Sequence, residues 1–316
     1  MPELPEVETI AAGVHARVHG QHIVRVWTSG KPQTFKSPEA EIAAAVTGAR
    51  IESVRRVGKT IVISLHPEKV SGSKDVGAPS IAASSRWVGS NNTIVELLIH
   101  LGMTGRLLVS APEIPLAPHT HAVLTLADCR EIRFVDPRRF GRISLYSSTA
   151  AKSGAPGLDS ETWDRQPNSS KHTHFTGPGR EPLTISLADF VALFHSRRTP
   201  IKAALLNQSL LHGIGNIYAD ESLFRAAIRP TRQASRLTRA ELTRLRTALV
   251  KVLRRAIKLG GSSVSDYVDA EGMRGYFQIE HKVYGHAGGP CTACGTPIRK
   301  ITLAGRGTHF CPRCQK

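Results

Sequence analysis

The stretch IESVRRVGKTIVISLH, residues 51–66, indicates the fold of the first half of the chain. Its two segments, 51–57 and 60–66, are rich in β-branched residues and are separated by a turn signal at Gly58, which is typical of neighbouring strands. Further segments of this kind lie between 21 and 146, and many alternate in polarity. They are HIVRVW (22–27), TIVELLIHL (93–101), RLLVS (106–110), AVLTL (122–126), EIRFV (131–135) and RISLY (142–146). This part of the chain is therefore predicted to form an antiparallel β-sandwich or barrel.

Helical patterns flank the strands on both sides. Residues 5–18 carry one apolar face and acidic residues in the first turn, as a helix N-terminus favours. Residues 184–260 are predicted to be helical, with capping signals at Ser186, at Thr199-Pro200 and at Thr238. Between them, the glycines of GIGN (213–216) permit a tight turn that leads into a helix. Such a turn offers backbone N–H groups to a phosphate.

The charge of the chain indicates its class of partner. Its 316 residues include 42 Lys and Arg against 25 Asp and Glu, a formal net charge of +17. This excess favours a polyanionic partner such as nucleic acid. No apolar run approaches the roughly 20 residues that cross a bilayer, and the N-terminus has no apolar signal core. We therefore expect an intracellular protein, without membrane or nucleotide cofactor.

Four of the five cysteines predict a metal site. Cys291 and Cys294 form one C-x2-C pair, and Cys311 and Cys314 form a second pair after sixteen residues. This spacing is typical of a zinc ribbon with four thiolate ligands, in which the zinc is structural. The metal would stabilise a short C-terminal segment whose own core is small. The fifth cysteine, Cys129, is expected to be a small buried apolar group.

The N-terminus, MPELPEVETI, suggests a nucleophile. If an aminopeptidase removes Met1, Pro2 gains a free secondary amine, which can attack an electrophilic carbon and form a cationic imine. Glu3 and Glu6 provide carboxylates that could manage protons beside it, and the helix that follows favours the neutral amine. An MP start is common, so this interpretation depends on the rest of the chain.

Several motifs, in this order, resemble the formamidopyrimidine-DNA glycosylase family. They are MPELPEVET at the start, HLGMTG (100–105), DPRRFG (136–141), GIGNIYADESLF (213–224), GYF (275–277) and the terminal CTACG…GRGTHFCPRCQK. The resemblance implies an α+β multidomain fold: an N-terminal antiparallel β-sandwich with a flanking helix, a helix–two-turn–helix domain and a C-terminal zinc-finger β-hairpin. The sandwich domain would span residues 1–147, with an insert at 67–92, and a linker would span 148–183. The helix–two-turn–helix domain would span 184–262, a lesion-recognition loop 263–281 and the zinc finger 282–316.

The resemblance also implies an enzyme of base-excision repair. Such an enzyme removes oxidised purines (8-oxoguanine and formamidopyrimidines) from damaged double-stranded DNA and then cleaves the strand by β,δ-elimination. Pro2 would form the Schiff base, and Glu3 would act as acid and base during excision. Lys59 matches the lysine of β-elimination, and Arg306 matches the finger arginine of δ-elimination. The protein would act as a monomer in the bacterial cytoplasm, associated with the nucleoid, and would hold one structural Zn²⁺.

Further residues of the chain match the DNA-contacting positions of the family. Three would fill the gap left by the everted nucleotide; they are Met103, Arg138 and Phe140. Phosphates would be bound by His119, Arg139, Arg197, Lys202 and Asn216. Two positions depart from the pattern, because Thr120 and Asn207 stand where the family commonly has acidic residues.

Two alternatives share many of these features. An endonuclease VIII-like relative would prefer oxidised pyrimidines, but PELPEVE and Met103 argue against it. A non-catalytic zinc-ribbon DNA-binding protein would have the same charge and finger, but Pro2, Glu3, Lys59 and Arg306 argue for an intact active site.

Overall fold

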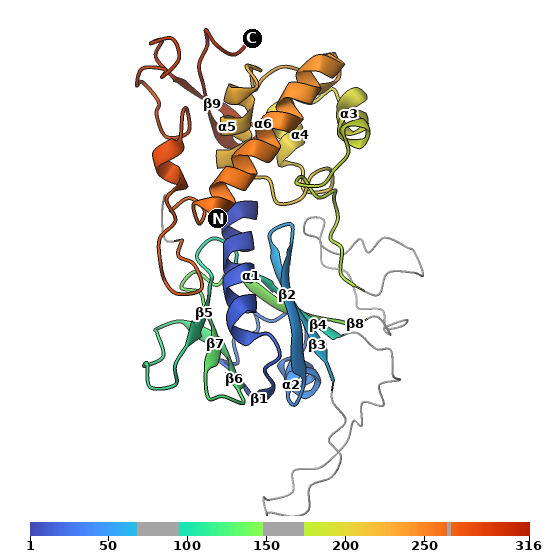
Figure 1. Cartoon of the computed structure of the whole chain (residues 1–316), viewed down its shortest axis with the longest axis vertical. Helices are drawn as coiled ribbons and strands as arrows, with labels where there is room; N and C mark the ends of the chain where they lie inside the picture. The colour runs from blue at the N-terminus through green and yellow to red at the C-terminus, as the bar shows by residue number, and fades with distance from the viewer. Residues whose placement is uncertain (68–94, 148–173, 264–266) are drawn as a thin grey trace, which may run out of the picture.

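The computed structural model describes residues 1–67, 95–147, 174–263 and 267–316. These residues form two lobes joined along the N-terminal helix, α1 (Leu4–Val18) (Figure 1). The lower lobe is a β-sandwich, and the upper lobe contains helices and a C-terminal hairpin. Pro5 lies in the first turn of α1, where a missing N–H is not needed, and the apolar face of α1 is buried.

The lower lobe contains two antiparallel sheets of four strands, which confirms the predicted sandwich. One sheet has the strand order β2-β3-β4-β8 and the other has the order β1-β6-β7-β5. The strands are β1 (Ile23–Thr28), β2 (Arg50–Val57), β3 (Thr60–His66), β4 (Val95–His100), β5 (Arg106–Ser110), β6 (Thr120–Leu126), β7 (Glu131–Val135) and β8 (Arg142–Ser147). All eight overlap the strand segments predicted from the sequence.

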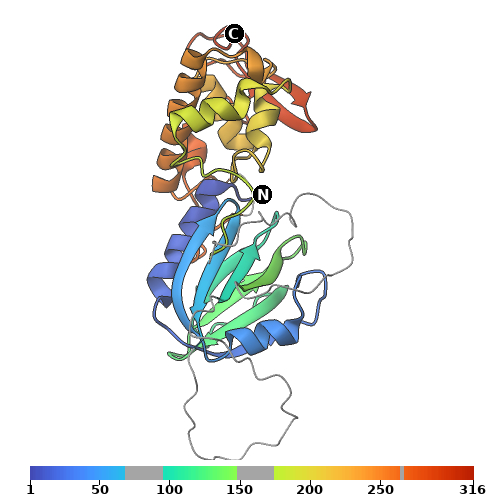
Figure 2. The ribbon, with the colours of Figure 1, turned by 90° about the vertical axis from the view of Figure 1, so that its right-hand side faces the viewer.

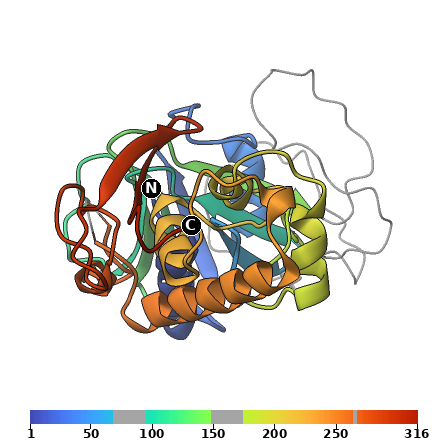
Figure 3. The same ribbon diagram turned by 90° about the horizontal axis from the view of Figure 1, so that it is seen from above.

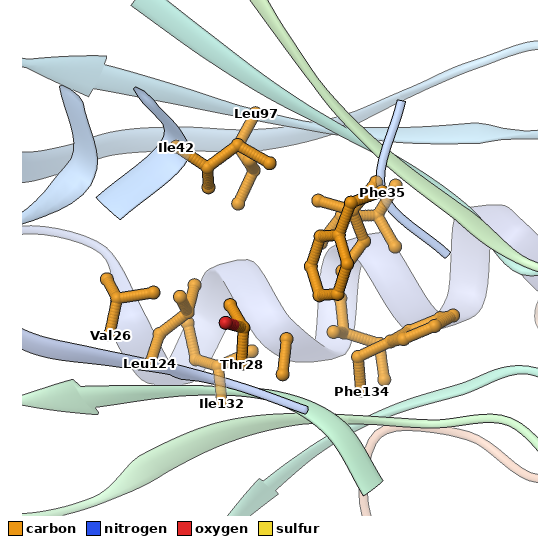
Figure 4. A pocket seen from close by; sticks show the side chains of 12 residues that line it. Val26, Thr28, Phe35, Ile42, Leu97, Leu124, Ile132 and Phe134 are labelled. Atoms are coloured by element: carbon orange, nitrogen blue, oxygen red, sulfur yellow. The ribbon is translucent and has the colours of Figure 1, made fainter. Parts of the chain in front are cut away.

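The core between the two sheets is apolar. Ile61 and Leu97 from one sheet face Leu124, Ile132 and Phe134 from the other, and all five are at most 4% exposed. A cavity of about 10 Å³ remains in this core, lined almost entirely by apolar side chains that include Leu97, Leu124 and Phe134 (Figure 4). Such a space has room for one water molecule at most, so it reflects packing rather than a ligand site.

A short helix, α2 (Glu39–Val46), covers the lower end of the sandwich and was not predicted from the sequence (Figure 2). It follows Pro38 at the N-cap position, and Ile42 and Val46 are its buried residues. With only two buried residues at i and i+4, its apolar pattern is too short to stand out among the strand signals.

The upper lobe contains four helices and a hairpin. They are α3 (Leu187–His195), α4 (Ile201–Leu206), α5 (Asn216–Arg225), α6 (Arg239–Lys258), β9 (Arg299–Leu303) and β10 (Arg306–Phe310), with short 3-10 helices at Ala234–Arg236 and Phe277–Glu280. Two of the predicted caps are present: Ser186 accepts a hydrogen bond from Asp189 N, and Thr238 forms a capping box with Glu241. At Thr199-Pro200 the helix α4 does begin, with Pro200 at the N-cap, but no side chain caps it. Seen from above, α6 and the hairpin lie on opposite sides of α5 (Figure 3).

Residues 174–183, at the end of the predicted linker, pack against the sandwich. Glu96 of β4 is fully buried and accepts hydrogen bonds from Phe175 N (2.7 Å), His174 Nδ1 (2.9 Å) and Arg55 (2.9 Å). Glu181 accepts from Arg56 at 2.9 Å and lies 3.1 Å from His212 Nε2, which precedes the turn before α5. This segment therefore ties the two lobes together. The rest of the predicted linker, residues 148–173, lies outside the described residues. So does the predicted insert at 67–92, except for residue 67.

The prediction for Cys129 is wrong. Its side chain is exposed in the turn between β6 and β7, where its φ of 71° lies in the left-handed region. A strand-like sequence on both sides concealed a turn that no glycine marks. Among the described residues, no helix is long and apolar enough to cross a membrane.

Candidate active site and DNA-binding face

The N-terminal residues lie where the two lobes meet. Pro2 and Glu3 are buried, whereas Met1 is 48% exposed. Leu4 N donates a hydrogen bond to Gly213 O at 2.9 Å, so the start of α1 is held against the turn that precedes α5. Gly213 has φ 88°, and a Cβ there would lie 2.9 Å from Leu4 Cβ, which explains the need for glycine.

The carboxylate of Glu3 lies at the N-terminus of α5. It accepts hydrogen bonds from Ile217 N at 3.0 Å and from Tyr218 N at 3.4 Å. A Cβ on Gly215 would lie 2.2 Å from Glu3 Cδ, so the GIGN turn makes room for this carboxylate. Burial raises the pKa of Glu3 to about 7, although Lys59 and the two backbone donors oppose the shift. A carboxyl group with this pKa can exchange a proton near neutral pH.

Lys59 is positioned by the turn between β2 and β3. Gly58, with φ 60°, forms this turn, and Lys59 immediately precedes β3. Burial lowers the pKa of the Lys59 ammonium group, Glu3 opposes this shift, and Arg306 adds to it. The structure therefore brings three of the predicted catalytic residues, Glu3, Lys59 and Arg306, into one electrostatic environment.

His100 lies beside this group, since it pairs with Thr60 across the β3–β4 ladder. Its Nδ1 accepts a hydrogen bond from Gly102 N at 3.1 Å. Burial, with Lys59 and Arg142 as nearby cations, lowers the pKa of His100 to about 4. The imidazole is therefore neutral at pH 7 and orients the HLGMTG turn.

Glu6, expected from the sequence to manage protons beside Pro2, instead has the contacts of a positioning residue. Its carboxylate accepts hydrogen bonds from Glu3 N (2.9 Å), Ser262 N (2.7 Å) and the Tyr218 hydroxyl (2.5 Å). Burial raises the pKa of Glu6, while these donors oppose the shift. The three donors come from the N-cap of α1, from α5 and from the segment that follows α6, so Glu6 joins the elements that surround Glu3. The i, i+3 spacing from Glu3 was the available sequence signal, since it matches a capping box.

The three predicted void-filling side chains are exposed on adjoining turns. Met103 is 44% exposed and Phe140 is 50% exposed, while the Arg138 guanidinium lies 4.8 Å from the centre of the Phe140 ring. Asp136 is buried and accepts hydrogen bonds from Gly141 N at 2.7 Å and from Thr104 Oγ1 at 2.6 Å. It therefore holds both turns together. Large apolar tips that remain exposed are suited to insertion between bases.

The predicted phosphate-binding residues do not all share one environment. His119, Arg139 and Arg197 are exposed, and Asn216 is half-buried, with its Nδ2 donating to Gly307 O at 2.9 Å. His119 and Arg139 lie near the void-filling turns. Arg139 stands between Arg138 and Phe140 in the chain, and His119 O accepts a hydrogen bond from Asp136 N at 3.0 Å. Both have φ in the left-handed region, 65° for His119 and 55° for Arg139.

Lys202 occupies a different place from the one expected. It is fully buried, and its Nζ lies 2.7 Å from Asp220 Oδ1, 3.0 Å from Gly307 O and 2.8 Å from Thr308 Oγ1. These three acceptors match the three donors of an ammonium group. We therefore assign Lys202 to the attachment of the β9–β10 hairpin rather than to a phosphate.

Glu221 attaches the zinc-finger region to α5. Its fully buried carboxylate accepts hydrogen bonds from three successive backbone N–H groups, at Lys282, Val283 and Tyr284, over 2.9–3.0 Å. Asn207, one of the two departures from the family pattern, is exposed and accepts from Ser209 N at 2.9 Å. The other, Thr120, is buried and donates to Ala117 O at 2.6 Å.

The four paired cysteines are arranged to hold one metal ion. Their sulfur atoms all lie within 4.8 Å of one another. The Sγ atoms of Cys291 and Cys314 are 3.9 Å apart, and those of Cys294 and Cys311 are 3.5 Å apart. Tetrahedral zinc with Zn–S bonds of about 2.3 Å requires sulfur separations of roughly 3.8 Å. Four thiolates leave no open position, so the zinc is structural and fixes the hairpin that carries Arg306.

Three segments of the chain match the profiles of known protein families. Family profiles match residues 1–143 (Formamidopyrimidine-DNA glycosylase N-terminal domain), 178–268 (Formamidopyrimidine-DNA glycosylase H2TH domain) and 288–316 (Zinc finger found in FPG and IleRS). The formamidopyrimidine-DNA glycosylase of Solibacter usitatus is 39% identical, and that of Listeria innocua is 37% identical; in each case the alignment covers all of both chains.

Solved structures agree with these relatives. A Lactococcus lactis FPG mutant in complex with Fapy-dG-containing DNA has a TM-score of 0.77 and 28% identity, with both chains covered fully. MutM (Fpg) from Thermus thermophilus has a TM-score of 0.74 and 37% identity, over 99% of this chain and 98% of that chain. The sandwich, the helical lobe, the cysteine cluster and these full-length similarities together show that the chain belongs to the formamidopyrimidine-DNA glycosylase family.

Proposed function

We propose that this protein is a base-excision repair DNA glycosylase with AP lyase activity, acting on oxidised purines in duplex DNA. The observation that carries the proposal is the arrangement at the lobe junction. There, Glu3 has a pKa of about 7, follows directly after Pro2, and shares its surroundings with Lys59 and Arg306. A nucleophile, an acid, an amine and a phosphate-binding cation are the groups that this chemistry requires.

In the proposed reaction, the Pro2 nitrogen attacks C1′ of the damaged nucleotide and the bond from C1′ to the base breaks. The proton released from the Pro2 nitrogen passes to the departing base. Glu3 then donates a proton to O4′ as the C1′–O4′ bond breaks, which opens the sugar ring and leaves an iminium ion between Pro2 and C1′. Lys59 assists removal of a C2′ proton, so that the C3′–O bond breaks. Arg306 binds phosphate and assists the second elimination, at C5′, and water then releases the enzyme. While Met1 is attached, the Pro2 nitrogen is a tertiary amide and cannot react in this way.

The exposed side chains between the lobes would recognise the duplex. Met103 and Phe140 would occupy the space of the everted nucleotide, which reduces the cost of unstacking. The guanidinium of Arg138 would donate hydrogen bonds to the orphaned base. Phosphates would be contacted by His119, Arg139, Arg197 and Asn216. We propose that the protein does this as a monomer on nucleoid DNA in the cytoplasm.

Two matched duplexes test the substrate class. One carries 8-oxoguanine opposite cytosine, and the other carries thymine glycol opposite adenine. We expect excision of 8-oxoguanine to be faster by at least about tenfold, equivalent to about 1.4 kcal/mol in activation free energy. Single-turnover strand cleavage measures both rates. A preference for thymine glycol would support an endonuclease VIII-like enzyme instead, and tight binding without cleavage of either duplex would contradict catalysis.

A further inference from the structure

The outer face of α6 carries a row of cations that the proposed reaction does not use. Arg244, Lys251, Arg254 and Lys258 are all exposed, and we call these four residues the α6 basic stripe. The opposite face of the helix is apolar and buried, for example at Leu245, against α1, α3 and α5. The stripe is therefore presented to solvent along its whole length.

Among the described residues, three of the four other charged side chains of α6 have polar partners, and Arg239, in the first turn of the helix, is the exception. Glu241 pairs with Arg232, Arg246 donates to Ile185 O at 2.9 Å, and Arg255 pairs with Glu280. Within the described ranges, no ion pair or hydrogen bond involves a side chain of the stripe. Arg254 lies three residues after Lys251 and four before Lys258, and like charges at these spacings repel each other on a helix. The dipole favours cations only near the helix C-terminus, so it does not account for Arg244.

The stripe lies on the opposite side of the upper lobe from the proposed DNA-binding face. In Figure 2, α6 forms the left edge of this lobe, whereas the β9–β10 hairpin and the N-terminus lie toward the right. Figure 3 shows the same separation from above, with α5 between α6 and the hairpin. A duplex held between the hairpin and the void-filling turns would therefore leave the stripe uncovered.

The spacing and surroundings of the stripe favour a second duplex over an acidic protein. Arg244, Lys251 and Lys258 recur every seven residues, which places them about 10 Å apart along about 21 Å of helix. Double-stranded DNA presents one charge per roughly 1.7 Å, so it offers phosphates along this whole length. The exposed uncharged residues of α6, Ala240 and Thr247, are small. The stripe therefore lacks the large apolar anchors that dominate protein–protein interfaces.

We propose that the α6 basic stripe binds a second segment of double-stranded DNA while the first occupies the active site. The protein would then pass from one segment to another through a bridged intermediate, without being released into solution. This inference depends on the proposed function only for the identity of the polyanion, because a protein that works on duplex DNA meets further segments continuously.

Competitor-dependent dissociation tests the proposal in the full-length zinc-bound protein. The protein is bound to a fluorescent duplex with an uncleavable abasic analogue, and its release is measured against increasing concentrations of undamaged duplex. The test variant is Arg244→Gln/Lys251→Gln/Arg254→Gln. The matched control, Arg244→Lys/Lys251→Arg/Arg254→Lys, changes the same exposed positions and keeps their charge.

We expect the release rate of the wild type and of the control to rise with competitor concentration. In the test variant, the competitor-dependent component of the release rate should be about tenfold lower than in the wild type. The slope of the logarithm of this component against the logarithm of the salt concentration should decrease in magnitude by about 2.7. Single-turnover excision should be unchanged in both variants. Release that is independent of competitor, or an unchanged test variant, would overturn the proposal. Equal loss of excision would instead place the stripe in the primary DNA-binding face and would also overturn it.

Discussion

Glu3→Gln is expected to lower the rate of 8-oxoguanine excision by about 10³-fold, within the usual range for general acid–base catalysis. Cleavage of a preformed abasic site should fall far less, because no base has to leave from that substrate. The Gln side chain can still accept hydrogen bonds from Ile217 N and Tyr218 N, so the geometry at the start of α5 should be retained. Single-turnover rates on the two substrates measure the difference.

The pH dependence of excision provides a second measurement on the same variant. The pKa of Glu3 is about 7, so its acid form predominates below pH 7 and declines about tenfold per pH unit above it. The wild-type excision rate should therefore show a descending limb with a midpoint near pH 7. The residual excision by Glu3→Gln should lack this limb, because Gln does not titrate.

Glu8→Gln is the matched control for this prediction. Glu8 also lies on α1, but its carboxylate pairs with Arg56 Nε at 2.7 Å rather than facing α5. Arg56 keeps its second partner, Glu181, so both rates should remain close to those of the wild type. Equal loss of both activities in Glu3→Gln, or no loss, would contradict the assigned role of Glu3.

Cys311→Ser is expected to abolish stable zinc binding and to weaken binding of a lesion-containing duplex by about a hundredfold. Among the described residues, the buried cluster around Cys291 and Cys311 adds just two apolar side chains, Val283 and Ile298, so the segment has little core of its own. Loss of one thiolate should therefore release the hairpin that carries Arg306. Metal analysis and fluorescence anisotropy at fixed salt measure the two effects.

Cys129→Ser supplies the control for cysteine chemistry. Cys129 is exposed in the β6–β7 turn, and the cysteine cluster does not include it. This variant should keep both its zinc and its DNA affinity. If Cys311→Ser bound the duplex as tightly as the wild type, the finger would not be needed to position Arg306.

Most elements of the fold were predictable because they carry a local signal. The alternating strands, the capping residues at Ser186 and Thr238 and the cysteine spacing all depend on near neighbours in the chain. By contrast, α2 has too few buried residues to produce a clear period, and the turn at Cys129 has no glycine. The structure places both by packing and by strand pairing.

The catalytic candidates were predictable through their motifs, but the supporting roles of the residues around them were not. Glu6, Glu221 and Lys202 are charged, and charged side chains are usually solvated. Their burial depends on donors and acceptors that are distant in sequence, such as Ser262 N for Glu6 and Gly307 O for Lys202. A motif can indicate that such a residue matters, whereas only the folded chain shows which groups it contacts.

The most direct test of the proposed function is to trap the imine with borohydride and to map the linked residue by mass spectrometry. A chain that begins at Pro2 is incubated with a duplex that carries 8-oxoguanine opposite cytosine, beside a matched chain in which Met1 is retained by an uncleaved N-terminal extension. We predict a covalent adduct at the Pro2 nitrogen in the first chain and none in the second. An adduct at Lys59, or an equal adduct in the extended chain, would contradict the assignment of Pro2 as the nucleophile.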